Sequence, residues 1–201
     1  MTAEAAPVRK GQRTREEIVR RAAAVFNTRG YAGASMSDIM AATGLEKGGL
    51  YNHFTSKEEL ALAALEYANA QQEARFRQLT DRGTTRLEHL RGAIAAFAET
   101  LATLQIPGGC PVMRMAIDGQ PALRDRSREI MARWRSGYAY LVRKAIEAGE
   151  LDAAVEPDAF GTMIVATMEG AMLLSQMEDG RQPLDRAAAF LQEYVSARSI
   201  V

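Results

Sequence analysis

The chain has 201 residues, enough for a small head and a larger companion domain. Its 25 Lys and Arg balance 25 Asp and Glu, and a net charge of zero argues by itself against a nucleic-acid-binding protein. A single cysteine excludes an intramolecular disulfide, and neither a signal-peptide apolar region nor a bilayer-spanning run is visible. These features predict a soluble, cytoplasmic protein without membrane association.

The distribution of charge is less neutral than its total. Residues 1–60 contain nine Lys or Arg and seven Asp or Glu, a net charge of +2, whereas residues 61–201 carry a net charge of −2. Within residues 1–30, seven basic residues stand against three acidic ones. The N-terminal part is therefore the place where contacts to phosphates are expected.

The first helix is predicted to begin at Thr14, because Glu17 three residues later completes a capping box. Before it, residues 1–12 are interpreted as a disordered basic terminus, with a minor-groove arm as the alternative. Gly30 is expected to end the helix. One apolar stripe at helical spacing runs along it: Ile18, Ala22, Val25 and Phe26.

The stretch that follows predicts two short helices joined by a tight turn. Ser35 and Asp38 form a second capping box, and Gly44 ends this helix because glycine adopts a left-handed backbone without steric cost. The chain restarts as a helix over Lys47–His53. This order describes a helix-turn-helix unit, in which the second helix enters the DNA major groove.

A third capping box, Ser56 with Glu59, opens a long helix to about Leu79. Three capping boxes in under fifty residues show strong local agreement about the fold. The helices before it are expected to share a three-helix core, closed by apolar residues from the second and third of them: Ile39, Met40, Leu50 and Phe54.

The remaining two thirds of the chain are predicted to be entirely helical. A stripe in steps of three and four marks one helix, which Pro107 and two glycines break: Leu87, Leu90, Ile94, Phe97, Leu101 and Leu104. A short helix should run from Pro111 to Asp118, followed by a long one from Pro121 to Gly149. One face of that long helix is apolar: Ile130, Trp134, Tyr138, Leu141 and Ala145.

The last two helices carry more apolar surface than one chain can bury. From Pro157 to about Glu178 the pattern is apolar nearly all round, which predicts burial on more than one side. A second copy of the chain is the simplest source of the second surface. The final helix is expected from Leu184, with a continuing stripe at Ala188, Leu191 and Val195.

Several segments at the N-terminus together resemble the DNA-binding domain of the TetR family of bacterial transcriptional regulators. They are Thr14–Arg29, GYAGASMSDIMAATGL, EKGGLYNHF and SKEEL, which appear in order and at family spacing. Two positions depart from the family pattern: Glu46 stands where Ser or Thr often caps the recognition helix, and Gly49 stands where Thr or Ser often contacts DNA.

The resemblance implies an all-α fold of two parts. Residues 12–72 would form a three-helix DNA-binding domain, and residues 73–201 a helical domain for effector binding and dimerisation. The final two helices would pair with their symmetry mates as a four-helix bundle.

Nine residues are candidates for contacts to DNA. Lys47 suits guanine acceptors, and Asn52 can pair bidentately with adenine. Gly48 and Gly49 permit close backbone approach to a phosphate, and Lys57 opposes the dipole of its own helix, which favours a role as a phosphate contact. Further phosphate donors are Ser35, Ser37, Tyr51 and His53. Structural alternatives remain open for three of these residues, because Tyr51 can pack, Ser35 can cap and Lys47 can be a surface charge.

The larger domain offers candidates for binding a small hydrophobic effector. As the resemblance implies a cavity there, its expected lining is Met113, Trp134, Tyr138 and Met168, with plain core packing as the alternative for each Met. Cys110, at the start of a helix, is either an oxidant-sensing thiol or a buried one. Glu169 binds either a cationic effector or a polar partner.

Catalytic and metal-binding patterns are missing from the sequence. His53, His89 and Cys110 give no metal-ligand spacing, and no P-loop, GxSxG or HExxH is present, so neither an enzyme nor a cofactor is expected. The sequence predicts a homodimeric, ligand-responsive repressor that an effector releases from a pseudo-palindromic operator. The alternative is a small helical ligand-binding protein or enzyme without DNA binding.

Overall fold

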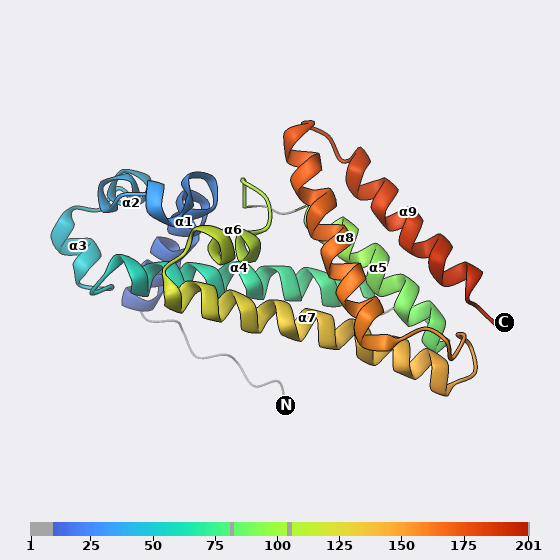
Figure 1. Cartoon of the computed structure of the whole chain (residues 1–201). Helices are drawn as coiled ribbons and strands as arrows, with labels where there is room; N and C mark the ends of the chain where they lie inside the picture. Colours follow the sequence, from blue (N-terminus) through green and yellow to red (C-terminus); the bar gives the residue numbers. More distant parts are fainter. Residues whose placement is uncertain (1–9, 81–82, 104–105, 201) are drawn as a thin grey trace, which may run out of the picture.

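The computed structural model describes residues 10–80, 83–103 and 106–200, and the predicted all-α fold is confirmed there (Figure 1). Besides the helices, the described residues contain one isolated bridge, between Leu151 and Ser199. The helices are α1 (Lys10–Gly33), α2 (Met36–Thr43), α3 (Lys47–Tyr51), α4 (Lys57–Thr80), α5 (Arg86–Ala102), α6 (Pro111–Asp118), α7 (Pro121–Glu147), α8 (Pro157–Met177) and α9 (Gln182–Ala197).

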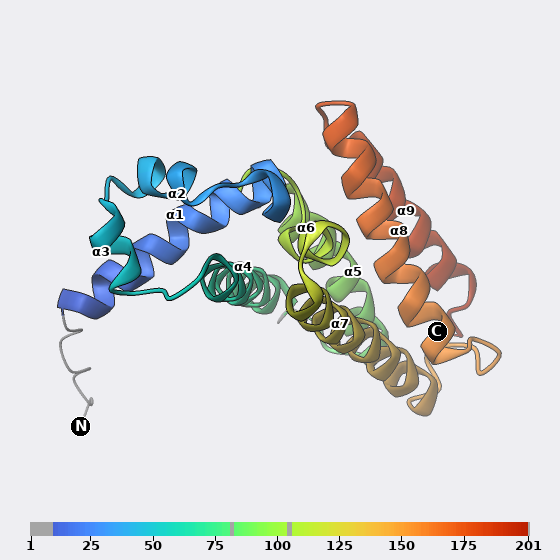
Figure 2. The same cartoon turned by 60° about the vertical axis from the view of Figure 1, so that its left-hand side comes forward.

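The helices form an elongated arrangement with two different ends. In both views α3 lies at one end, beside α2, and the α8–α9 pair lies at the other (Figures 1 and 2). Helix α4 packs on α1 at the first end and on α5, α6 and α7 further along, so it connects the two parts. The domain boundary expected between residues 72 and 73 falls inside this continuous helix and stays a prediction.

The capping residues of the helix-turn-helix behave as the sequence predicts. The Ser35 side chain accepts from the Asp38 N–H at 3.1 Å, and the Asp38 carboxylate accepts from the Ser35 N–H at 2.8 Å. Gly44 has φ 69° and donates its N–H to the Met40 carbonyl at 2.9 Å. Gly30, with φ 74°, interrupts the regular backbone of α1 near its end, also as predicted.

The predicted start of the first helix is wrong. Helix α1 begins at Lys10, so Thr14 lies inside the helix and not at its N-cap position, and residues 10–12 of the predicted arm are helical. Residues 1–9 lie outside the described residues. Glu17 instead accepts hydrogen bonds from Arg20 at 2.7 Å and Arg21 at 2.5 Å, which lower its pKa to about 2. Pairs at this spacing favour helix, and the helix extends past the expected cap.

The third predicted box is half formed, and a further box escaped prediction. The Glu59 N–H donates to Ser56 Oγ at 3.0 Å, but the Glu59 carboxylate accepts from the Thr55 N–H and hydroxyl instead of from Ser56. Thr85 and Glu88 form a complete capping box at the start of α5. Each device satisfies an N–H that a helix N-terminus leaves without an intrahelical partner.

The predicted apolar stripes are largely buried. In the head, Ile18, Ala22, Phe26, Ile39, Leu50 and Phe54 are at most 1% exposed. In the larger part the predicted residues of α5 are buried except Leu104, which lies outside the described residues. These two clusters join into one hydrophobic core. Along the described residues, no helix is long and apolar enough to cross a membrane.

Candidate nucleic-acid interface and effector cavity

The recognition helix is shorter than predicted, ending at Tyr51 instead of His53. Its N-cap, Glu46, makes no side-chain capping hydrogen bond, as its departure from the family pattern suggested. Asn52 is the C-cap residue and donates its N–H to the Gly48 carbonyl at 3.1 Å. Asn52 and His53 therefore follow the helix, whereas Lys47 opens it.

Two cations of the interface lie over tyrosine rings. Lys47 Nζ is 6.0 Å from the centroid of Tyr51, whose side chain is 42% exposed at the tip of the head. Lys57 Nζ is 4.3 Å from the centroid of Tyr31, which is buried. Such contacts hold an ammonium near the surface without neutralising its charge. Both cations thus stay available to a phosphate.

The two serines at the start of α2 differ. The Ser35 hydroxyl donates to Asp38 Oδ2 at 2.7 Å, and the same carboxylate pairs with Arg29. The one hydroxyl donor of Ser35 is therefore already used within the chain, while its oxygen caps α2. These hydrogen bonds lower the pKa of Asp38. Ser37 is exposed on the first turn of the helix. Of the two, the geometry favours Ser37 as a phosphate donor.

The glycines of α3 face different surroundings. A Cβ at Gly48 would meet open space, whereas a Cβ at Gly49 would lie 3.6 Å from the Leu45 side chain. Gly48 thus belongs to the outer surface, and Gly49 faces the protein. Close approach of DNA is expected at Gly48.

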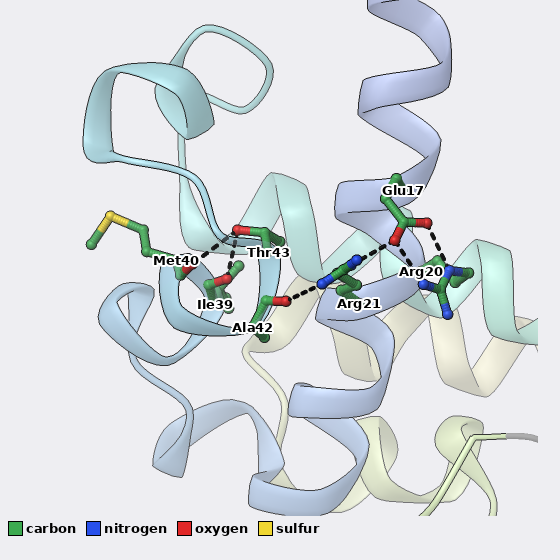
Figure 3. A network of polar contacts seen from close by, with 7 residues as sticks. All are labelled: Glu17, Arg20, Arg21, Ile39, Met40, Ala42 and Thr43. Atoms are coloured by element: carbon green, nitrogen blue, oxygen red, sulfur yellow. Dashed lines mark hydrogen bonds and ion pairs between the residues drawn. The ribbon is translucent and has the colours of Figure 1, made fainter.

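A polar network that the sequence analysis missed fixes α2 against α1 (Figure 3). Arg21 bonds to Glu17 and also donates to the Ala42 carbonyl at the end of α2 at 2.8 Å. Thr43 donates to the Ile39 carbonyl at 2.8 Å, which satisfies a further carbonyl of α2. Arg21 therefore positions the helix that precedes α3. The spacing of Glu17 and Arg21 in the sequence indicates an ion pair on one helix, but it does not indicate the contact of Arg21 with the Ala42 carbonyl, 21 residues away.

The head also contacts the larger part through the start and end of α6. Asn27 Nδ2 donates to the carbonyls of Pro107 and Gly109, both at 2.8 Å. At the other end of α6 the Ala32 N–H donates to Asp118 Oδ2 at 3.3 Å. These contacts give a direct connection from α1 to the C-terminal helices, because α6 also packs on α7.

A cavity of about 330 Å³ lies between α4, α5 and α7. Phe97 is central to its aromatic wall, with its ring centroid 6.0 Å from that of Trp134 and 5.9 Å from that of Tyr138. The predicted residues Trp134 and Tyr138 both line it, and Met113 and Met168 do not. Met168 is fully buried in the core and Met113 packs on that core, as the alternative reading for each Met supposed.

Cys110 and Glu169 meet in the interior. Burial, and the nearby Glu169 carboxylate, raise the pKa of the Cys110 thiol well above its usual range. A thiol that stays protonated is a poor nucleophile, so the geometry disfavours the oxidant-sensing alternative. Burial also raises the pKa of Glu169 to about 7, and neither of its carboxylate oxygens has a hydrogen-bond partner within the described residues.

The outer surface of α8 carries several exposed apolar side chains, as the sequence suggested, whereas α9 exposes Phe190 among the charged residues Asp185, Arg186 and Glu193. The large exposed side chains there are Met163, Leu173, Leu174, Met177 and Phe190. Leu191 of the predicted stripe is instead 1% exposed and packs inside the protomer. Exposed large apolar side chains on two helices that pack together favour an interaction site. Among the described residues no group of three His, Cys, Asp or Glu could hold a metal ion.

These features define a helix-turn-helix protein with a larger helical part that contains an apolar cavity. The model of the tetR family of bacterial regulatory proteins matches residues 18–64, and that of the tetracyclin repressor-like C-terminal domain matches residues 86–191. The chain belongs to the TetR family. It is a DNA-binding transcriptional regulator and not an enzyme.

Individual relatives agree along most of the chain. The HTH-type transcriptional repressor DhaR of Mycobacterium sp. (strain GP1) is 29% identical, covering 86% of this chain and 87% of its own. A TetR transcriptional regulator from Chloroflexus aurantiacus J-10-FL has a TM-score of 0.89 and 41% identity, with 96% and 98% of the two chains covered. A cysteine mutant of the TetR family regulator CifR, complexed with 26-bp double-strand operator DNA, has the same fold, with a TM-score of 0.77, 23% identity and 98% and 100% coverage.

Proposed function

We propose that the protein is a homodimeric repressor that binds a pseudo-palindromic operator in the cytoplasm and leaves it when a small hydrophobic effector binds. The observation that carries this proposal is the pairing of an exposed recognition helix with an aromatic cavity, joined by α4. The operator complex of CifR supports it, since that regulator shares the fold. DhaR, a relative along most of the chain, is named a repressor.

At the DNA, we assign different roles to the exposed polar residues. Lys47 opens α3 and would reach base edges, as would Asn52 just after the helix. Lys57 and Ser37 would contact phosphates on either side. Supporting phosphate or backbone contacts are proposed for Gly48, Gly49, Tyr51 and His53, whereas Ser35, whose N–H and hydroxyl both donate to Asp38, would serve as the cap of α2.

The dimer would form through α8 and α9. The exposed apolar residues of the two helices need a second apolar surface, and another copy of the same surface supplies it by two-fold symmetry. Two heads would then read half-sites one or more DNA turns apart. A single head, with a five-residue recognition helix, offers few base contacts by itself.

The effector would act through α4. Gln72, Glu73 and Phe76 of this helix line the cavity, and Lys57 begins the same helix at the head, about 22 to 28 Å away along a straight α-helix. Moving one end therefore moves the other. For a complete switch the effector must favour the released conformer by about 5.5 kcal/mol.

The test uses Lys57→Ala and DNA from upstream of the protein's own gene. If Lys57 contacts a phosphate, the variant should bind operator and non-specific DNA more weakly, and the slope of log K against log salt should become shallower by about one unit. The control is Lys144→Ala, because Lys144 also lies over a tyrosine ring but in the last turn of α7, outside the helix-turn-helix.

The results separate the proposal from its rival. An unchanged slope for Lys57→Ala would show that this lysine only packs on Tyr31. A wild-type protein without salt-sensitive DNA binding would favour a helical ligand-binding protein instead. Release of bound DNA by the effector is measured separately.

A further inference from the structure

Two buried polar side chains stand at the deep end of the aromatic cavity. Gln72 of α4 and Thr100 of α5 line it and are only 5% and 3% exposed. The charged residues that also line it, Glu73, Arg77 and Arg133, have side chains between 39% and 70% exposed, which places them at the mouth. The cavity is therefore charged outside and neutral inside.

Both inner side chains have a polar atom to spare. Within the described residues, Gln72 Oε1 and Thr100 Oγ1 are buried without a hydrogen-bond partner. Gln72 uses its other end, since Nε2 donates to Cys110 Sγ at 3.8 Å. A buried polar atom without a partner lowers the free energy of unfolding, and an occupant that forms a hydrogen bond with the atom removes this cost. Two residues of one cavity wall that each carry such an atom indicate an occupant that forms hydrogen bonds.

The rest of the inner wall is apolar. Phe76, Phe97 and Trp134 present aromatic rings, and Tyr138 is committed elsewhere because its hydroxyl donates to the Ala93 carbonyl at 3.2 Å. Burial raises the pKa of Tyr138 well above its usual range, so the phenol stays neutral. A flat apolar ligand suits these walls.

The chemistry of the two atoms selects the polar group of the ligand. Gln72 Oε1 only accepts a hydrogen bond, whereas the Thr100 hydroxyl can donate or accept. A ligand hydroxyl meets both, donating to Gln72 and accepting from Thr100. An ether or ketone oxygen would meet Thr100 alone, and a carboxylate would face the Gln72 oxygen unfavourably.

Charge at the mouth further restricts the ligand. Glu73 lies within 4 Å of both Arg77 and Arg133, at 3.7 and 3.9 Å, so the three side chains carry a net charge of +1. A cationic ligand would enter against this charge. The same two inner residues also line a second cavity of about 520 Å³ that reaches Arg20 and Ala24 of α1, so a ligand bound to them would sit beside the head.

We propose that the cavity takes a neutral hydroxylated aromatic compound, whose hydroxyl binds between Gln72 and Thr100. This inference rests on the proposed function, in which the cavity is the effector site. It adds the class of ligand and the two residues that select it. The hydroxyl is the specific element, because the aromatic wall accepts any flat apolar body of suitable size.

The test compares two probes by isothermal titration calorimetry on the full chain without DNA. The probes are 2-naphthol, which carries the hydroxyl, and 2-methoxynaphthalene, which accepts but cannot donate. We expect 2-naphthol to bind at least about tenfold more tightly, as one hydrogen bond to a buried acceptor allows. Equal affinity, or no binding of either probe, would overturn the proposal.

Variants assign the effect to the two residues. Thr100→Val keeps the shape and removes the hydroxyl that donates to the oxygen of either probe, so it should weaken 2-naphthol and the ether alike, each by about tenfold. Thr103→Val, at the C-cap of α5 and outside the lining of this cavity, is the matched control and should change neither probe. Gln72→Leu removes the acceptor that only 2-naphthol can use, so in this variant the preference for 2-naphthol should disappear.

Retention of the full preference in Gln72→Leu, or unchanged affinity of both probes in Thr100→Val, would contradict the assignment. Failure of the proposed function gives a different result: 2-naphthol would bind with the expected preference, yet DNA bound to the protein would stay bound. Calorimetry thus tests the ligand class, and DNA release tests the regulation.

Discussion

The head and the larger part of the molecule differ in how many buried polar atoms lack a hydrogen-bond partner and in how many large apolar side chains are exposed. Among buried polar atoms without a partner in the described residues, only Asn27 Oδ1 belongs to residues 10–56, whereas Gln72, Thr100, Ser127 and Glu169 contribute several. Exposed large apolar residues divide in the same way: of those described, Tyr51 is the single one in α1–α3.

This difference indicates what each part still needs. The head satisfies nearly all of its buried polar groups with partners in the chain. Its capping box and the Arg21 network hold α2, the helix before α3, in one orientation, which suits a rigid, polar target. The larger part leaves apolar surface outside and unpaired polar atoms inside. A second copy of the chain would cover the apolar surface, and a ligand would pair with the buried polar atoms. A part that responds to a ligand thus differs from a part that binds DNA.

The largest expected effect separates inner from outer apolar residues of the proposed dimer helices. Leu191→Asp should unfold the protomer, because it buries an unpaired charge at a cost of several kcal/mol. Leu173→Asp, at a side chain 47% exposed, should leave the fold intact and dissociate the dimer. Circular dichroism and light scattering measure the two outcomes. A Leu173→Asp protein that keeps the dimeric mass would exclude this face as the interface.

The next effect concerns the buried acid. Burial raises the pKa of Glu169 from 4.5 to about 7, so the folded state binds more protons between these values. The free energy of unfolding should therefore fall as pH rises from about 4.5 to about 7, and the loss of about 3 kcal/mol should be complete above pH 7.

Glu169→Gln should remove this loss, stabilising the protein at pH 8 and changing little at pH 4.5. Urea unfolding at several pH values gives the measurement, with Glu178→Gln, exposed beyond the end of the same helix, as the control. Equal stability of Glu169→Gln and the wild type at pH 8 would show that the carboxylate finds a partner in solution.

A third prediction tests whether the exposed polar residues of the head contact DNA bases. Asn52→Ala should relax base preference at one position in each half-site, costing about 1–3 kcal/mol for the preferred base and nothing in folding. Asn52 is exposed after α3, so its loss removes no buried contact. Binding to a set of single-base operator variants measures this. Uniform weakening across the set would instead identify a phosphate contact.

The smallest effect compares two serines, one from each part. Ser35→Ala removes a capping hydrogen bond and should cost about 1 kcal/mol of unfolding free energy. Ser127→Ala removes a hydroxyl that is fully buried without a partner in the described residues, so it should be neutral or stabilising. Equal destabilisation in urea would mean that a buried water satisfies Ser127.

Much of the fold and part of the site follow from local sequence. The box of Ser35 and Asp38 and the left-handed Gly44 involve atoms within four residues of each other, so short-range chemistry determines them. The same holds for the exposed Lys47 and for the stripe that places Trp134 and Tyr138 on one face of α7. Each of these features needs only helical geometry.

Tertiary structure decided the features whose partners lie far along the chain. The thiol of Cys110 has a raised pKa because folding buries it and brings Glu169 beside it, which decides between the sensing thiol and the buried thiol that the sequence left open. Met168 faces the core and Gln72 and Thr100 face the cavity because three helices meet there. A helical pattern shows that a side chain points inward, but the packing of other helices determines whether it meets core, cavity or charge.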